Sequence, residues 1–227
     1  MSDDKLQVVR NVHIPARDTH FQAALAMGPI VNGHGTYQLS KLVKSLELVK
    51  NKDMALDIGA HVGLWSMILA RHFKTVHAFE PLPIHIDCFI KNTKFLHNVT
   101  LHKIALGNAD GIVGMLAAED NSGNTRVAPN TIFSSAAAIH RLDHIAESLK
   151  IVKVDYIKID VEGYELQVVR GAEKLIKDSK PVMVVEQKSG NAERYEGDRT
   201  GLVIELLHSW GAETVWVRSG DYCLRWR

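Results

Sequence analysis

The stretch Tyr156–Glu165, YIKIDVEGYE, places three acidic residues directly behind a short apolar pattern. Asp160 stands where the apolar pattern ends, and Glu162 and Glu165 follow it closely. Carboxylates at such a point can take a proton from a hydroxyl, contact a substrate or ligate an oxygen-preferring cation. They also suit a helix start, because Asp is a favoured N-cap and the helix dipole stabilises acids in the first turn. Both interpretations stand until the surrounding elements are considered.

A second stretch with chemical potential is LDIGAHVGLWS, which begins at Leu56. Gly59 and Gly63 lie between a strand pattern and a helix pattern, so the backbone can approach a ligand and the helix can present free N–H groups. Glu80 closes the next strand pattern about 20 residues further on, where a carboxylate can accept hydrogen bonds from both ribose hydroxyls. The combination predicts a site for a nucleoside-containing cofactor.

The glycine spacing departs from the dinucleotide pattern G-x-G-x-x-G, because His61 stands where the second glycine is needed. Asp57, just before the loop, is a poor neighbour for a pyrophosphate. It is a good neighbour for a cation such as the amino group or sulfonium of S-adenosylmethionine. The loop therefore favours that cofactor over NAD.

Short apolar strand patterns alternate with amphipathic helix patterns from residue 37 to the end of the chain. Strands are expected at 54–59, 75–81, 99–106, 154–160 and 181–188, helices at 37–50, 63–73, 83–97, 141–150, 164–178 and 200–211, and a hairpin at 213–227. This order predicts an α/β fold with a mostly parallel sheet, helices on both faces and a C-terminal antiparallel hairpin. Ligands of such sheets bind beyond the carboxyl ends of the strands, where strand order reverses.

Two segments stand outside this alternation. Residues 1–36 read as an N-terminal extension or cap, with a short helix and a loop, ahead of a single domain at 37–227. Residues 107–135 are rich in Gly, Asn and Ser and indicate an irregular insertion or a pair of edge strands. Both are expected to shape the substrate pocket.

The composition is that of a globular protein, with 46% hydrophobic and 23% charged residues. A net charge of +1 gives no strong nucleic-acid signal and no support for a polybasic membrane anchor. Neither an apolar run of membrane-spanning length nor a secretory signal is apparent, and the two cysteines are expected as buried thiols. The sequence thus predicts a cytoplasmic protein, with homo-oligomerisation left open.

Several stretches together resemble the FkbM-type branch of class I S-adenosylmethionine-dependent methyltransferases. They are ALDIGAHVGLWS, VHAFEPLP, IALGNADG and VDYIKIDVEGYELQVVRGAEKLI, with RLDHI and PVMVVEQK in the expected order. The similarity covers roughly residues 35–190. It implies a seven-stranded Rossmann-like sheet and methyl transfer, commonly to oxygen, with S-adenosyl-L-methionine as the cofactor.

The resemblance also implies roles for individual residues. It places the cofactor loop at Asp57–Gly63, the ribose contact at Glu80, the adenine contacts after the third strand, and Asp160 beside the methyl group. His61 stands where relatives often carry Asn. The implied cofactor-binding residues are Asp57, Gly59, Ala60, His61, Gly63, Glu80, Ala105, Leu106, Asn108 and Asp160.

The catalytic candidates are Asp160, His34 and Glu162. Asp160 is expected to contact the acceptor or act as the general base, or else to cap the following helix. His34 lies in a glycine-flanked loop that could cover the pocket. Asp160, Glu162 and Glu186 have the oxygen ligands that Mg²⁺ prefers, but the pattern does not require a metal and none is expected.

The acceptor predicted from these features is the hydroxyl of a sugar or small molecule. Three alternatives remain: a methyltransferase acting on nucleic acid or protein, an NAD-binding Rossmann dehydrogenase, and a non-catalytic cofactor-binding domain. Near-zero net charge disfavours nucleic acid, and the loop around His61 disfavours the dehydrogenase.

Overall fold

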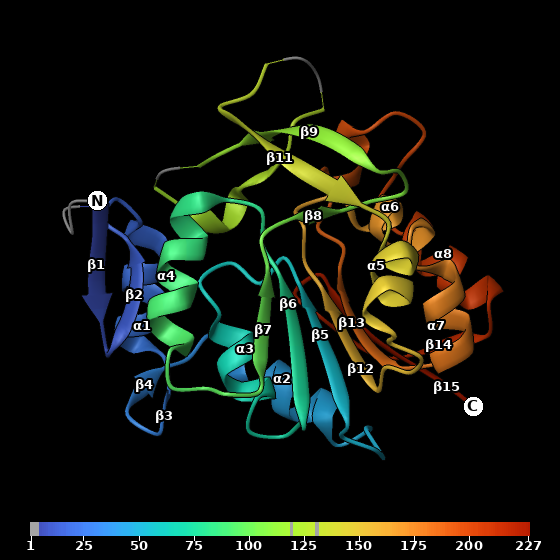
Figure 1. Cartoon of the computed structure of the whole chain (residues 1–227), viewed down its shortest axis with the longest axis horizontal. Coiled ribbons are helices and arrows are strands. Elements are labelled where there is room, and N and C mark those ends of the chain that lie inside the picture. Colours follow the sequence, from blue (N-terminus) through green and yellow to red (C-terminus); the bar gives the residue numbers. More distant parts are fainter. Residues whose placement is uncertain (1–4, 119, 130–131) are drawn as a thin grey trace.

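The computed structural model describes residues 5–118, 120–129 and 132–227, and it is organised around one seven-stranded sheet (Figure 1). The strand order is β14-β15-β13-β12-β5-β6-β7. The strands are β5 (Met54–Ile58), β6 (Thr75–Phe79), β7 (Val99–His102), β12 (Tyr156–Ile159), β13 (Val182–Glu186), β14 (Ala212–Arg218) and β15 (Asp221–Trp226). The five from β13 to β7 are parallel, and β15 and β14 form an antiparallel hairpin at one edge. The predicted Rossmann-like class with its terminal hairpin is confirmed.

Both faces of the sheet are covered because its strands are apolar on both sides. Ile157 and Ile159 pack against α5 (Leu142–Leu149), α6 (Glu165–Arg170), α7 (Glu173–Ser179) and α8 (Leu202–Ser209). The intervening positions, such as Tyr156, face α2 (Leu39–Leu46) and α3 (Leu64–Leu69). This alternation fixes the register of the strands whose ends carry the site.

The order of the strands reverses between β5 and β12. The chain runs outward from β5 to β6 and β7, then returns to place β12 on the other side of β5. A crevice is expected beyond the carboxyl ends of two strands arranged in this way. The glycine loop follows β5, and the acidic stretch follows β12.

The insertion at 107–135 is more regular than expected. It belongs to a four-stranded sheet in the order β10-β9-β11-β8 that lies over the carboxyl edge of the main sheet (Figure 1). The strands are β8 (Ala105–Leu106), β9 (Gly111–Leu116), β10 (Arg126–Val127) and β11 (Ser135–His140), and Ser122–Asn124 form a 3₁₀ turn. The single strand predicted at 99–106 is therefore two, because β7 pairs with β6 while β8 pairs with β11.

The helix predicted at 164–178 is also divided, into α6 and α7, at Gly171. A Cβ atom at Gly171 would lie 1.8 Å from the carbonyl oxygen of Gly107. Only glycine permits this approach, so the residue that looked like a weak helix position is a packing contact with the start of the insertion.

The N-terminal segment lies beside α4 (Pro83–Thr93), at the left of Figure 1. It contains β1 (Leu6–Val9), β2 (Val12–Pro15), α1 (Thr19–Met27), β3 (Ile30–Val31) and β4 (His34–Gly35). Ile14 and Leu25 share an apolar cluster with Val62 and Cys88 of the main fold. Residues 5–36 thus pack into the same body, and a boundary at 36 stays a prediction.

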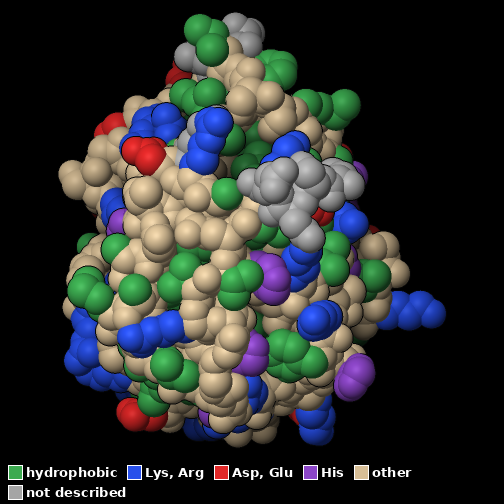
Figure 2. Space-filling view, turned by 90° about the vertical axis from the view of Figure 1, so that its left-hand side faces the viewer, with side chains coloured by type: hydrophobic (Ala, Val, Ile, Leu, Met, Phe, Trp, Pro, Cys, Tyr) green, Lys and Arg blue, Asp and Glu red, His purple; other side chains and the backbone are tan. Residues whose placement is uncertain are grey.

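Figure 2 shows the face that carries this segment. Lys and Arg side chains are scattered over it among apolar and neutral groups, without a continuous stripe of described basic residues. None of the helices in the described part of the chain has the length and apolar character needed to cross a bilayer.

Asn92 on α4 joins the N-terminal segment to the main fold by hydrogen bonds. Its side chain accepts a hydrogen bond from His13 N (2.7 Å) and donates to His13 O (2.9 Å) and Val62 O (2.8 Å). Asn92→Ala should lower the free energy of unfolding by about 2–4 kcal/mol, since it leaves buried backbone groups unpaired. Chemical denaturation measures this. The exposed Lys94→Ala on the same helix end should change it by less than about 0.5 kcal/mol, and equal effects would show that Asn92 does not join the segments.

Candidate active site

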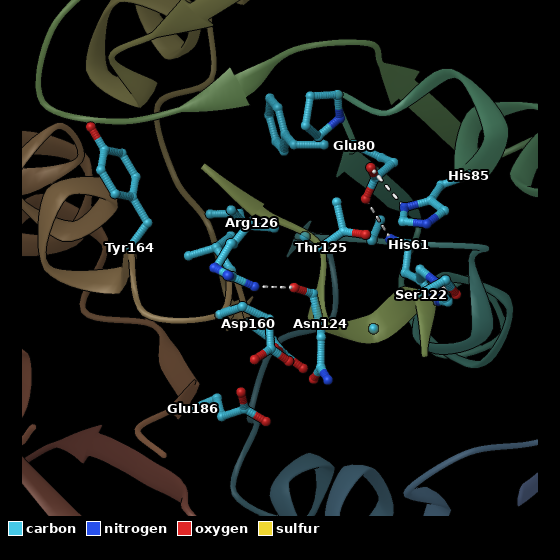
Figure 3. A pocket seen from close by; sticks show the side chains of 18 of the residues that line it. His61, Glu80, His85, Ser122, Asn124, Thr125, Arg126, Asp160, Tyr164 and Glu186 are labelled. Atoms are coloured by element: carbon cyan, nitrogen blue, oxygen red, sulfur yellow. Dashed lines mark hydrogen bonds and ion pairs between the residues drawn. The ribbon is translucent and has the colours of Figure 1, made fainter. Parts of the chain in front are cut away.

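A cavity of about 420 Å³ opens at the carboxyl ends of β5, β6, β12 and β13 (Figure 3). Its floor is made by the loops after these strands. Phe21, Tyr37 and the 122–127 segment contribute to its cover, so the N-terminal segment and the insertion both border the cavity. The crevice expected from the strand order is therefore lined by all three parts of the chain.

The glycine loop brings the ends of β5 and β12 into contact. Gly59 has φ +73°, and a Cβ atom there would lie 1.9 Å from the carbonyl oxygen of Asp160. No other residue fits this position without moving the acidic loop. His61 has φ +51°, a left-handed conformation in which Asn, Asp and His are the most frequent non-glycine residues. Histidine adopts this conformation more readily than most other non-glycine residues.

Glu80 is buried and holds the loop in place. Its Oε2 accepts from His61 N (2.9 Å), and its Oε1 accepts from Leu82 N (2.9 Å) and lies 3.2 Å from His85 Nδ1. A carboxylate offers about four lone-pair positions, so capacity remains for a ligand hydroxyl. Glu80 thus lines the cavity and also shapes it.

A hydrogen-bond chain joins the cover to the glycine loop. His61 Nε2 lies 2.6 Å from Ser122 Oγ, and the Ser122 hydroxyl donates to Asp18 Oδ2. Asp18 is fully buried and caps α1 by accepting from Phe21 N (2.7 Å). Burial, with smaller contributions from His85 and Lys158, lowers the pKa of His61 well below its ordinary value. The imidazole is therefore neutral at neutral pH and acts here as a polar link.

Lys158 lies between the two strand ends. Its Nζ donates to the carbonyl oxygen of Gly59 (2.7 Å) and lies 3.5 Å from Asp57 Oδ1 and 3.8 Å from Asp160 Oδ2. Burial alone would lower the pKa of Lys158, but the charges of Asp160 and Asp57 raise it above its ordinary value. The side chain is thus a buried ammonium that holds both acids near the loop.

The structure separates the three acids of the opening stretch. Glu165 is buried, and its Oε1 accepts from Val161 N (3.1 Å) and Gly163 N (3.0 Å). Within the described chain, no hydrogen bond joins the carboxylate of Asp160 to the N–H groups of that turn. Glu165, not Asp160, therefore holds the start of the helix, and the Asp160 side chain points into the cavity (Figure 3).

Asp160, Glu162 and Glu186 form an acidic cluster, with one carboxylate oxygen from each within 4.8 Å of the others. Lys188 Nζ lies 2.8 Å from Glu186 Oε1 and 3.3 Å from Glu162 Oε1. Glu162 has a left-handed backbone, φ +55°, and its Oε2 accepts from Asn191 Nδ2 (2.9 Å). The cluster could hold an oxygen-preferring cation, but an ammonium already occupies one side of it.

Most of the residues suggested by the sequence meet in this cavity, and four do not line it. The lining includes Gly59, Ala60, His61, Glu80, Ala105, Leu106, Asp160 and Glu162. Asp57 lies behind the loop, where its Oδ2 accepts from Ser66 Oγ (2.6 Å), and Gly63 precedes α3. Asn108 is exposed, and His34 packs against Phe95, with the two rings tilted, at a different, smaller depression.

Further polar residues line the cavity without having been expected there. Among them are His85, Ser122, Asn124, Arg126 and Lys188. Lys188 follows Glu186 by two residues, so the alternation of side chains along β13 was a usable signal. The three residues of the insertion had no local signal, because their position depends on how the small sheet folds over the main one.

The fold and the site define a Rossmann-like protein of the class I methyltransferase type. The sequence model of the family described as methyltransferase FkbM domain matches residues 57–214. The chain belongs to this family.

Two curated relatives match part of the chain. "Methyltransferase 1" of Beauveria bassiana is 27% identical, covering 51% of this chain and 57% of that protein. "Hexuronic acid methyltransferase AglP" of Haloferax volcanii is 26% identical, covering 56% of this chain and 52% of that protein. The chain thus spans about half the length of the curated relatives it matches.

Solved structures agree on the fold. Methyltransferase FkbM from Methylobacillus flagellatus has a TM-score of 0.50 at 17% identity, covering 78% of this chain and 44% of that one. Precorrin-6y C5,15-methyltransferase from Geobacter metallireducens has a TM-score of 0.51 at 15% identity, covering 85% and 93%. At these identities the likeness supports the architecture alone.

The buried Glu165 should make the free energy of unfolding depend on pH. Burial raises the pKa of Glu165 to about 7. The folded state therefore keeps a proton that the unfolded state releases above about pH 4.3, so this group makes the free energy of unfolding fall from about pH 5 to about pH 7. Glu165→Gln should lose that part of the decline in urea denaturation series. The exposed Glu173→Gln should keep it, and identical slopes in wild type and Glu165→Gln would contradict the assignment.

Proposed function

We propose that the protein is an S-adenosylmethionine-dependent methyltransferase that methylates a hydroxyl of a sugar or small molecule. The observation that carries this proposal is the meeting, in one cavity, of a glycine loop with Glu80 and of the acidic cluster at the ends of β12 and β13. The first half suits a nucleoside, and the second suits a hydroxyl that must lose a proton.

The cofactor half fits S-adenosylmethionine on the chemistry of its residues. Glu80 retains acceptor capacity for ribose hydroxyls, and Ala105 and Leu106 offer an apolar surface for adenine. Asp160, at the cavity wall, is suited to a neighbouring cationic group. When bound, the cofactor supplies an electrophilic methyl group; the chain's own residues bind it, exclude water and orient the acceptor.

The acceptor half favours a polar molecule with several hydroxyls. Carboxylates, an amide and a guanidinium line it, with Arg126 above, Asp160 and Asn124 side by side in the middle, and Glu186 below (Figure 3). Tyr37 and Trp65 add aromatic surface to the lining. The name of the Haloferax relative, a hexuronic acid methyltransferase, supports a saccharide.

The same features disfavour the alternatives. A net charge of +1 gives little attraction to nucleic acid, and the left-handed His61 stands where a dinucleotide loop needs glycine. The carboxylates on the acceptor side disfavour a non-catalytic module. Residues 37–227 are proposed as the methyltransferase domain, with 1–36 as a cap over its cavity.

The direct test is a methyl-transfer screen with isotope-labelled cofactor against monosaccharides, uronic acid glycosides, small phenols, peptides and RNA. We expect label on a saccharide or small-molecule hydroxyl. Label only on peptide or RNA would replace the proposed acceptor, and absence of transfer to any class would contradict the proposal.

The ribose contact is tested by Glu80→Ala. Loss of a charged acceptor should weaken S-adenosylhomocysteine binding about 10-fold or more in calorimetry. Glu47→Ala, on the exposed surface, is the matched control. Unchanged affinity in a variant that is folded by circular dichroism would mean that the ribose lies elsewhere.

The acceptor contact is tested by Asp160→Asn. Because Asp160 lies at the acceptor side of the glycine loop, kcat should fall at least about 10-fold while the S-adenosylhomocysteine Kd changes less than about three-fold. The reverse pattern would make Asp160 a cofactor residue.

The ammonium of Lys188 supports methyl transfer without a divalent ion. Activity after removal of metals with a chelator should stay within about two-fold of the starting value, because all three acids already lie near an ammonium, Glu162 and Glu186 near Lys188 and Asp160 near Lys158. Loss of activity with recovery on adding Mg²⁺ would show instead that the acidic cluster binds metal.

A further inference from the structure

Glu186 is a buried acid with one oxygen unaccounted for. Its side chain is 2% exposed at the carboxyl end of β13. Oε1 is held by Lys188 at 2.8 Å, but Oε2 is buried and has no hydrogen-bond partner in the described part of the chain. A buried polar atom without a partner is costly, so its presence in a cavity wall indicates a group supplied by a ligand. The partner of a carboxylate oxygen must be a donor, such as a hydroxyl.

The two neighbouring acids are less suited to take a proton. Both oxygens of Glu162 have partners, Lys188 and Asn191. Asp160 Oδ2 lies 3.8 Å from Lys158 Nζ, so this carboxylate already faces a buried ammonium. Among the three acids, Glu186 is the one with a buried oxygen that has no partner in the described chain, and the residue lines the cavity.

We propose that Glu186 is the catalytic base of this site, with Oε2 accepting the hydroxyl proton of the acceptor and Lys188 as its positioning residue. The inference rests on the proposed O-methyl transfer. Methyl transfer forms an O–C bond and breaks the S–C bond of the sulfonium, whose electron pair remains on the now neutral sulfur. The hydroxyl proton passes to Glu186 Oε2, and the resulting neutral carboxyl releases it to water.

The charges around Glu186 suit this role. Burial raises the pKa of Glu186, and the negative charges of Asp160 and Glu162 raise it further, whereas Lys188 opposes the rise. A base with a raised pKa takes a proton more readily, and catalytic groups work best near the operating pH.

Charged and titratable groups from the neighbouring elements surround Glu186. The loop after β12 supplies Asp160 and Glu162, β12 supplies Lys158, and β15 supplies Asp221, which pairs in register with Glu186. Tyr37 precedes α2, and Lys41 of that helix bonds to Asp221.

The test compares wild type, Glu186→Gln, Lys188→Met and the exposed control Glu196→Gln, with labelled cofactor and phenyl β-D-glucuronide or phenyl β-D-glucoside as acceptor. Glu186→Gln should lower kcat about 100-fold or more while S-adenosylhomocysteine affinity stays within about three-fold of wild type. Wild-type kcat/KM should rise with pH above the ordinary titration range of a glutamic acid, because the pKa of Glu186 is raised. Lys188→Met should move that rise to higher pH, and Glu186→Gln should abolish it.

A second readout needs no acceptor. Infrared difference spectra between wild type and Glu186→Gln should show one carboxyl that stays protonated above the ordinary range of a glutamic acid, and Lys188→Met should extend it to higher pH. Ordinary ionisation of Glu186, or a Glu186→Gln variant that keeps its kcat, would overturn the inference. If the wild-type protein binds S-adenosylhomocysteine but transfers label to no hydroxyl, the proposed function is contradicted. The infrared spectra then remain the test of the proposal for Glu186.

Discussion

The buried ammonium of Lys158 is the interaction on which the site depends. It joins the end of β5, through Asp57 and the carbonyl of Gly59, to the end of β12 at Asp160. Unpaired charges are costly in an apolar interior, so the acids and the lysine each need the other in place. The same lysine fixes the close approach of the glycine loop to the acidic loop, which brings a cofactor-type loop and an acidic wall into one cavity.

As a second consequence of this arrangement, the acidic residues along the cavity lie in two different environments. Around Glu80, the negative charge is bound by backbone N–H groups and His85 and serves to shape the loop. Around Glu186, Lys188 pairs with Glu186 and Glu162 while Asp160 lies near Lys158, and Glu186 Oε2 is buried without a partner in the described part of the chain. The surroundings of Glu80 suit the binding of a ligand, and the surroundings of Glu186 suit the transfer of a proton.

The sequence predicted the sheet and most of the floor of the cavity, because strand alternation and the glycine loop depend on neighbouring residues. It placed Gly59, His61, Glu80 and Asp160 together for that reason. It could not place the cover, because Ser122 reaches His61 only through the fold of a sheet built from distant strands. His34, expected at the pocket, lies beside Phe95 instead, since its loop turns towards α4. A glycine-flanked histidine carries no information about that direction.

We propose that the loop between β5 and α3 binds S-adenosylmethionine rather than a dinucleotide. Isothermal titration of the folded chain with S-adenosylhomocysteine and, separately, with NAD tests it most directly. We expect saturable binding of S-adenosylhomocysteine, at one molecule per chain, and no heat of binding with NAD. Saturable binding of NAD without binding of S-adenosylhomocysteine would contradict it.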